Sequence, residues 1–359
     1  MRQERVDYGF DNGLVMTQRQ LDADNPYLSH DTKIEIQQTE LYAIPKGGND
    51  EKRDAEVAEA MTNPVSIRVG GIAVEAALVG NKQAEVVRGV AYGWGGNLRH
   101  PVAIYEGQTL AANAPDELFV IINPPGSGRS DMLPAAVRKE VRRGNFAGYG
   151  EQIAQTIDVV AEGRDIQLYG HSFGGRTMTA AVPYFDSHIN SLTINDPVSG
   201  ESYGKTRITR LMRLVTGFGI TENSRLKKYI QAEFDPYESE LQKNPMKSAL
   251  RDTAQGTRGG WREQFLTDPI GLAEPGFADD LAEALPCIRE KLRVVSPSES
   301  AMNRHEAVSD IMAYALAHAK GVPPVVEQLI VHNHSHSFLT IPQALVAVYD
   351  ENFGVQKHS

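Results

Sequence analysis

The chain has 359 residues, of which 41% are hydrophobic and 23% are charged, and its net charge is −10. These proportions are typical of a globular protein, and the acidic balance argues against nucleic acid as a partner, because phosphate binding requires a basic face. No segment approaches the roughly 20 apolar residues that would span a bilayer, so no membrane partner is expected. The start of the chain, MRQERVDYGFDNG, holds no apolar stretch that could serve as a signal peptide, and the single cysteine excludes an intrachain disulfide. We therefore expect a cytoplasmic protein, with Cys287 as a buried, inert thiol.

Residues 1–63 are predicted to form an N-terminal arm and linker. This part is polar, although Ile34 and Ile36 hint at a short strand. Residues 46–62 are charged and end in a pattern that predicts a short helix.

From Pro64 onward, strands and helices alternate. Strands are predicted over 66–69, 72–79, 85–92, 117–123, 166–169, 191–195, 292–296 and 328–332, and helices over 148–162 and 173–184. The run ELFVIIN at 117–123 is nearly all apolar, which indicates a strand buried on both faces. Such alternation predicts an α/β fold in which a mostly parallel sheet carries helices on both faces. Residues 64–198 and 287–359 form this predicted core, and the charged, helix-like stretch 199–286 is predicted to be a helical cap inserted into it.

The segment Gly170-His171-Ser172-Phe173-Gly174 fits the pattern G-x-S-x-G between a predicted strand and a predicted helix. This context predicts a nucleophilic serine on a tight turn, with its hydroxyl above the end of the sheet. Side chains at Gly170 and Gly174 would collide with the neighbouring backbone. The helix that follows directs its unpaired N–H groups at the site, so the N–H of Phe173 is a candidate oxyanion donor.

With this motif, the chain resembles the α/β-hydrolase family over about residues 64–198 and 287–350. Tyr92-Gly93-Trp94-Gly95-Gly96 follows the third core strand, where the resemblance implies a second oxyanion donor, here the N–H of Trp94; Tyr92 replaces the histidine that often precedes the glycine. The stretch NPPGSGRS at 123–130 resembles the D-x-x-G-x-G-x-S turn of the family, with Asn123 in place of the usual aspartate. The family order of nucleophile, acid and histidine is available in this sequence.

A base must remove the serine proton, and histidine suits this task because its pKa lies near neutrality. The segment HNHSHSF at 332–338 offers three histidines. The family pattern of a small residue, a histidine and a later helix with proline favours His336, and His334 is the alternative. In a strand, His332, His334 and His336 would share one face, which leaves a metal-ligand set as a rival interpretation.

A carboxylate must orient the imidazole. The resemblance places it after the seventh core strand, in the stretch VVSPSES at 294–300, where Glu299 is the only carboxylate. Glu299 is thus the first choice, although Ser300 takes the acid position in one alignment. Asp196, after the sixth strand, is the main alternative, and Asp310 is a third.

The sequence therefore predicts a serine hydrolase that cleaves an ester, thioester or amide of a small-molecule acyl substrate, with no metal and no organic cofactor. An acyltransferase or carbon–carbon bond hydrolase on the same fold, and a non-catalytic ligand-binding protein, are the alternatives. The oligomeric state is open, and a homo-oligomer is compatible with the sequence.

Overall fold

In the computed structural model, the described residues are 33–36, 50–94, 97–99, 101–203, 261–300, 302–332 and 336. One sheet of nine strands runs through them, in the order β1-β9-β8-β7-β6-β4-β5-β3-β2. The strands are β1 (Lys33–Ile36), β2 (Val65–Val69), β3 (Ile72–Gly80), β4 (Val86–Ala91), β5 (Leu118–Asn123), β6 (Asp165–His171), β7 (Ile189–Asn195), β8 (Ile288–Pro297) and β9 (Val325–Val331). Strand β3 is antiparallel to β2 and to β5, and all other pairs are parallel.

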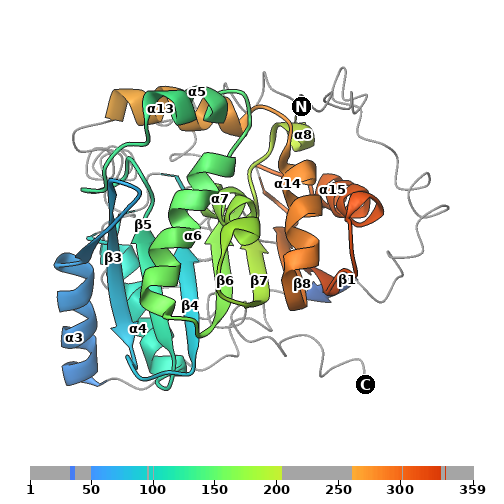
Figure 1. The fold of residues 1–359 in the computed structure, drawn as a ribbon. Helices are drawn as coiled ribbons and strands as arrows, with labels where there is room; N and C mark the ends of the chain where they lie inside the picture. The colour runs from blue at the N-terminus through green and yellow to red at the C-terminus, as the bar shows by residue number, and fades with distance from the viewer. Residues whose placement is uncertain are drawn as a thin grey trace.

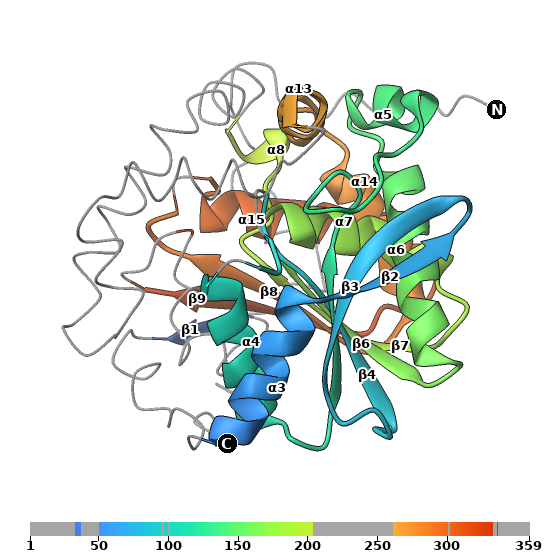
Figure 2. The ribbon, with the colours of Figure 1, turned by 90° about the vertical axis from the view of Figure 1, so that its left-hand side faces the viewer.

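Helices cover both faces of this sheet (Figures 1 and 2). They are α3 (Glu51–Thr62), α4 (Pro101–Asn113), α5 (Ala135–Val141), α6 (Ala147–Ala161), α7 (Phe173–Ala181), α8 (Gly200–Tyr203), α13 (Trp261–Leu272), α14 (Phe277–Ala284) and α15 (His305–His318), with 3-10 turns at Val182–Tyr184 and Leu285–Cys287. Helices α3 and α4 pack together on one face, while α6, α7, α14 and α15 form the layer on the other. The prediction of an α/β fold with a mostly parallel sheet is confirmed.

Strand β5 shows how the sheet sits between two apolar layers. All six of its residues are buried. Leu118, Val120 and Ile122 belong to the cluster that packs against α6 and α7, and Phe119 and Ile121 belong to the cluster on the α3 and α4 side. This alternation follows from the period of two along a strand, and it explains why the sequence of β5 is apolar without interruption.

Two elements of the predicted arm are part of the core. Strand β1 pairs in parallel with β9 at one edge of the sheet. Helix α3 begins after Asp50, whose side chain accepts hydrogen bonds from the N–H groups of Lys52 and Arg53. It buries Val57 and Met61 and packs against α4 and β3.

The predicted cap is described only in part, because residues 204–260 lie outside the described residues. Helices α5 and α13 contact each other above the edge of the sheet where the parallel strands end (Figure 1). Helix α14, also within the predicted cap, packs instead against α7 and α15 in the core layer. Cys287 is exposed, so the expectation of a buried thiol is wrong. None of the described helices is long and apolar enough to cross a membrane.

Candidate active site

Ser172 lies on the turn between β6 and α7. Its backbone angles are φ 57° and ψ −117°, a conformation that is rare for a residue with a side chain. The N–H of Ser172 donates to the carbonyl oxygen of Asn195, so the β6–β7 ladder extends to the serine itself. Helix α7 begins at Phe173, and the first N–H groups of a helix have no acceptor within it.

The glycines on either side of Ser172 are required by close backbone contacts. A Cβ atom at Gly170 would meet the backbone of Gly174, and a Cβ atom at Gly174 would meet the carbonyl oxygen of Ala91. Strand β6 and helix α7 are thereby able to approach each other and β4 closely enough to form the turn. These contacts confirm that a side chain at position 170 or 174 of the motif would collide with neighbouring backbone.

His336 is buried beside Ser172 although 164 positions separate them in the chain. Its Nε2 atom lies 2.9 Å from Oγ of Ser172. Its Nδ1 atom lies 2.6 Å from Oδ2 of Asp196. The geometry therefore favours His336 among the predicted bases, while His334 lies outside the described residues.

The structure places Asp196, the main alternative, and not Glu299 beside His336. Glu299 was the first choice from the sequence, but its side chain is exposed, and Nδ1 of His336 is hydrogen-bonded to Asp196. Asp196 is fully buried directly after β7, with a positive φ of 41°, and its N–H donates to the carbonyl oxygen of Val295 on β8. The third choice, Asp310, lies on α15.

Ser300 fills the position where the resemblance places an acid. Its hydroxyl donates a short hydrogen bond to Oδ2 of Asp196, the oxygen that also faces His336. The Ser300 oxygen in turn accepts the N–H groups of Met302 and Asn303. A buried carboxylate needs such donors, because it would otherwise be strongly disfavoured away from water.

The loop after β4 passes directly beside the serine. A Cβ atom at Gly93 would lie 3.3 Å from Cβ of Ser172 and 3.5 Å from Nδ1 of His171. Trp94, whose N–H is the second predicted oxyanion donor, is the next residue. The structure thus brings the start of this loop to Ser172, the predicted nucleophile, in the region where the resemblance places the oxyanion donors.

A buried network holds the far end of the same loop. The carboxylate of Glu75 on β3 accepts two hydrogen bonds from Arg99, at 2.6 and 3.0 Å, and one of 2.9 Å from the amide of Asn123. The Asn123 amide oxygen accepts the N–H of Leu98 at 3.0 Å. Burial alone would raise the pKa of Glu75, but the hydrogen bonds from Arg99, Arg129 and Asn123 outweigh it and hold that pKa below its usual value.

This network explains why asparagine stands at 123. Glu75 supplies a carboxylate from the neighbouring strand, and an aspartate at 123 would place a second negative charge against it. The amide instead donates to Glu75 and accepts from the loop.

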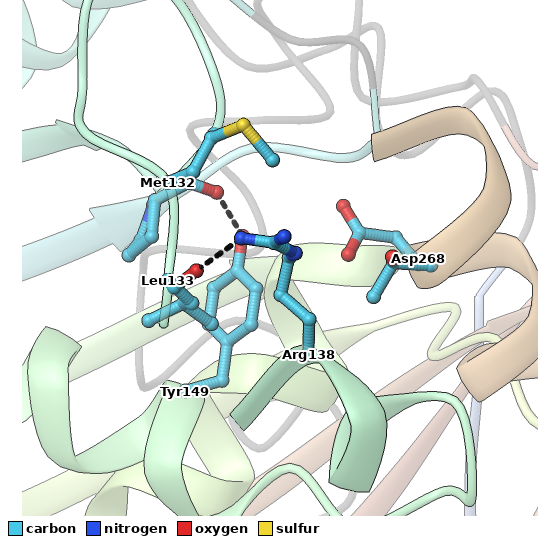
Figure 3. A pocket seen from close by; sticks show the side chains of 8 residues that line it. Met132, Leu133, Arg138, Tyr149 and Asp268 are labelled. Atoms are coloured by element: carbon cyan, nitrogen blue, oxygen red, sulfur yellow. Dashed lines mark hydrogen bonds between the residues drawn. The ribbon is translucent and has the colours of Figure 1, made fainter. Parts of the chain in front are cut away.

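A small, partly open pocket lies between α5, α6 and α13 (Figure 3). Its lining includes Met132, Leu133, Arg138, Tyr149 and Asp268, together with Pro125, Gly126 and Thr267. Arg138 donates to the carbonyl oxygen of Leu133, and the Tyr149 hydroxyl donates to that of Pro125. The carboxylate of Asp268 faces the guanidinium of Arg138 in Figure 3.

One aromatic contact joins this pocket to the nucleophile turn. The ring of Tyr149 packs edge-to-face on Phe173, with 5.4 Å between their centroids. Phe173 follows Ser172 directly in the chain, so this contact links a residue of the pocket lining to the residue after the serine.

The rival metal-ligand set includes His334, which lies outside the described residues. They hold no group of three or more histidine, cysteine, aspartate or glutamate side chains that could bind a metal ion. In His336, Nε2 faces Ser172 and Nδ1 faces Asp196.

Three residues near the site were not predicted for any role. Ser300 was considered only as a residue that displaces the acid, Glu75 looked like part of an ordinary strand, and His171 fills the variable position of the motif. Only Asn123 gave a signal, since an amide where the family has a carboxylate indicates that a carboxylate comes from elsewhere.

No family model matches this sequence, and no curated protein is similar to it in sequence. Its structure, however, is similar to those of solved proteins. An esterase from Exiguobacterium antarcticum is 13% identical with a TM-score of 0.55, and the match covers 79% of this chain and 98% of that one. A bromoperoxidase from Bacillus anthracis is 12% identical with a TM-score of 0.55, covering 82% and 100%.

A hydrolase from Pseudomonas aeruginosa PA01 is 14% identical with a TM-score of 0.53, covering 80% of this chain and 96% of that one. These neighbours share the α/β-hydrolase fold, and the chain has this fold too, as the sequence resemblance predicts.

Proposed function

We propose that this protein is a serine hydrolase that cleaves an ester, thioester or amide through Ser172, His336 and Asp196. One observation carries the proposal. The two ring nitrogens of His336 lie 2.9 Å from the Ser172 hydroxyl oxygen and 2.6 Å from the Asp196 carboxylate. An imidazole between a hydroxyl and a buried carboxylate is the arrangement that activates a serine.

The reaction begins when His336 accepts the Ser172 proton at Nε2 as the serine oxygen bonds to the acyl carbon. The hydrogen on Nδ1 then donates to Asp196, which stabilises the charged imidazole. The backbone N–H groups of Phe173 and Trp94 are the proposed donors to the oxyanion, and each such donor contributes roughly 3–4 kcal/mol in enzymes of this type. His336 next returns the proton to the leaving group, whose bond to the acyl carbon breaks.

A water molecule completes the cycle. His336 removes its proton, the water oxygen attacks the acyl-enzyme carbon, and the acid leaves as Ser172 regains its hydrogen. Transfer of the acyl group to an acceptor other than water would make the protein an acyltransferase, and attack on a ketone would make it a carbon–carbon bond hydrolase. The esterase and the hydrolase among the structural neighbours favour transfer of the acyl group to water.

The substrate is proposed to be a small acyl compound that extends into the pocket beside Tyr149. Met132, Leu133 and Pro125 provide apolar contacts there, and Arg138 and Asp268 provide polar ones. An acyl chain with a polar substituent suits this lining.

Labelling with a fluorophosphonate probe tests the proposal, because the probe bonds covalently to an activated serine. We expect the wild type to label and to hydrolyse acyl esters, and Ser172→Ala to fold normally but lose both properties. Ser66→Ala is the matched control, since Ser66 is exposed on β2. A wild type that does not label, or a Ser172→Ala variant with full activity, would overturn the proposal.

A further inference from the structure

His171 is the last residue of β6 and precedes the proposed nucleophile directly. The turn requires glycine at 170 and 174, but it places no such demand on position 171. The mechanism above does not use His171 either. Its contacts therefore need a separate explanation.

The ring of His171 contacts His336 in two ways. Nε2 of His171 lies 3.0 Å from the backbone carbonyl oxygen of His336. A carbonyl oxygen only accepts hydrogen bonds, so Nε2 carries a hydrogen. The two imidazole rings also pack against each other, with their centroids 5.0 Å apart and their planes tilted by 37°.

Burial keeps this ring neutral, although the hydrogen bond to the His336 carbonyl by itself favours the charged form. Desolvation, and then the neighbouring His336, lower the pKa of His171 to about 3, so it stays uncharged near neutral pH. The Nδ1 side of the ring faces the backbone of Gly93, where even a Cβ atom would lie 3.5 Å away. A neutral ring is also what the reaction needs, because a second positive charge would oppose protonation of His336.

We propose that His171 is a positioning residue that sets the place of the His336 backbone, so that its imidazole reaches Ser172 and Asp196 together. The proposal rests on the proposed function. Hydrogen bonds at Nδ1 and Nε2 fix the line of the imidazole between serine and carboxylate, but they do not fix where the main chain lies. The hydrogen bond from His171 supplies that third point of attachment.

A matched pair of variants separates the hydrogen bond from the bulk of the side chain. Glutamine and methionine are similar in length and volume, but only glutamine has an N–H group to donate. We expect His171→Met to lower kcat by about tenfold to a hundredfold, because a displaced base costs this much, while KM changes by less than about threefold. His171→Gln should stay within about fivefold of the wild-type kcat.

Thermal unfolding of both variants tells positioning from a structural role. If His171 only fills space, the two variants lose kcat equally, or lose it in proportion to their unfolding temperatures, and the proposal is wrong. The proposal also fails if His171→Met keeps wild-type kcat while the wild type labels with fluorophosphonate, and in that case the proposed function stands. A wild type that neither labels nor hydrolyses overturns both.

A measurement on the wild type does not depend on how the variants fold. In ¹⁵N spectra of histidine-labelled protein, the resonances that His171→Gln removes belong to His171. They should report a neutral ring with hydrogen on Nε2 from pH 8 down to about pH 5, consistent with the low pKa of this group. A neutral ring with its hydrogen on Nδ1 and none on Nε2 contradicts the proposal, because it could not donate to the His336 carbonyl.

Discussion

Ser300 and His336 converge on the same oxygen of Asp196. The carboxylate comes from the end of β7, and the serine from the turn after β8 that the sequence resemblance assigns to the acid. One strand therefore supplies the charge, while the neighbouring strand supplies a hydroxyl that holds it. The carboxylate beside the imidazole is thus Asp196, the alternative from the sequence, and not Glu299, the first choice.

The two candidate carboxylates make opposite predictions. Asp196→Asn should lower kcat by about 10⁴-fold, because an amide favours the wrong tautomer of the imidazole. Glu299→Gln should change kcat by less than about threefold, because an exposed side chain contributes little to the site. Steady-state kinetics with an activated acyl ester measures both. Equal, mild losses would remove Asp196 from the mechanism.

The carboxylate should be movable from β7 to β8. In Asp196→Asn/Ser300→Asp, the side chain at 300 offers a carboxylate close to the position that Asp196 Oδ2 occupies in the wild type. We expect this double variant to recover at least about tenfold in kcat over Asp196→Asn, because the charge that orients the imidazole is restored. Ser300→Asp alone should lose activity, since it sets two carboxylates against each other. Steady-state kinetics of these three variants tests the prediction, with Asp196→Asn/Ser300→Ala as the control. If Asp196→Asn/Ser300→Asp is no more active than that control, the prediction is wrong.

The sequence predicted the strands of the core well because their patterns are local. Strand β5 is apolar throughout, and the turn at Ser172 is marked by glycines on both sides. The sequence ranked Asp196 only second to Glu299, because only the fold decides which turn lies near His336, and Asp196 is 140 positions away from it. Helix α4 was not predicted, since it holds a glycine, Gly107, and lacks a distinct polar face.

Position 123 should not accept an aspartate in place of asparagine. Asn123→Asp would set an acidic oxygen in place of the amide nitrogen that now lies 2.9 Å from Glu75. We expect the free energy of unfolding to fall by about 3 kcal/mol, because the network would then hold a buried negative charge that no positive charge compensates. Urea unfolding measures this. Glu75→Gln in the Asn123→Asp background should restore part of the loss because one charge is removed, and an unchanged stability of Asn123→Asp alone would contradict the network described above.

Glu106 on α4 should make stability depend on pH. It is buried against the Tyr92 hydroxyl, and burial raises its pKa to about 8 from the ordinary value of 4.5. Between these values the unfolded chain has released the proton and the folded chain has kept it, so stability falls as pH rises. Glu106→Gln stays neutral at every pH.

The variant should therefore gain at least about 1 kcal/mol relative to the wild type between pH 5 and pH 8. Denaturant unfolding of both proteins at the two pH values measures this difference. Asp280, whose pKa burial raises to about 7, contributes in the same direction but equally to both proteins. A difference that does not change with pH would show that Glu106 ionises normally.

The pocket beside Tyr149 should set the preferred length of the acyl group. Leu133 lines this pocket, and Leu133→Trp would fill part of its volume. We expect kcat/KM for long acyl esters to fall by about tenfold or more relative to acetyl esters. The reason is that losing the contacts of one or two methylene groups with an apolar pocket lowers kcat/KM by about this factor. Leu133→Met, which conserves volume, is the control. The ratio is taken within one variant, so folding losses cancel, and an unchanged ratio would place the substrate elsewhere.

The pairing of β1 with β9 has a consequence for how the protein is made. During synthesis, every strand from β2 to β8 leaves the ribosome before β9 does, and β1 must wait for this last partner to join the sheet. His336 follows β9, so Ser172 is synthesised long before the histidine that is proposed as its base. In the proposed mechanism, the serine of the nascent chain therefore has no base until the residues after β9 have been made.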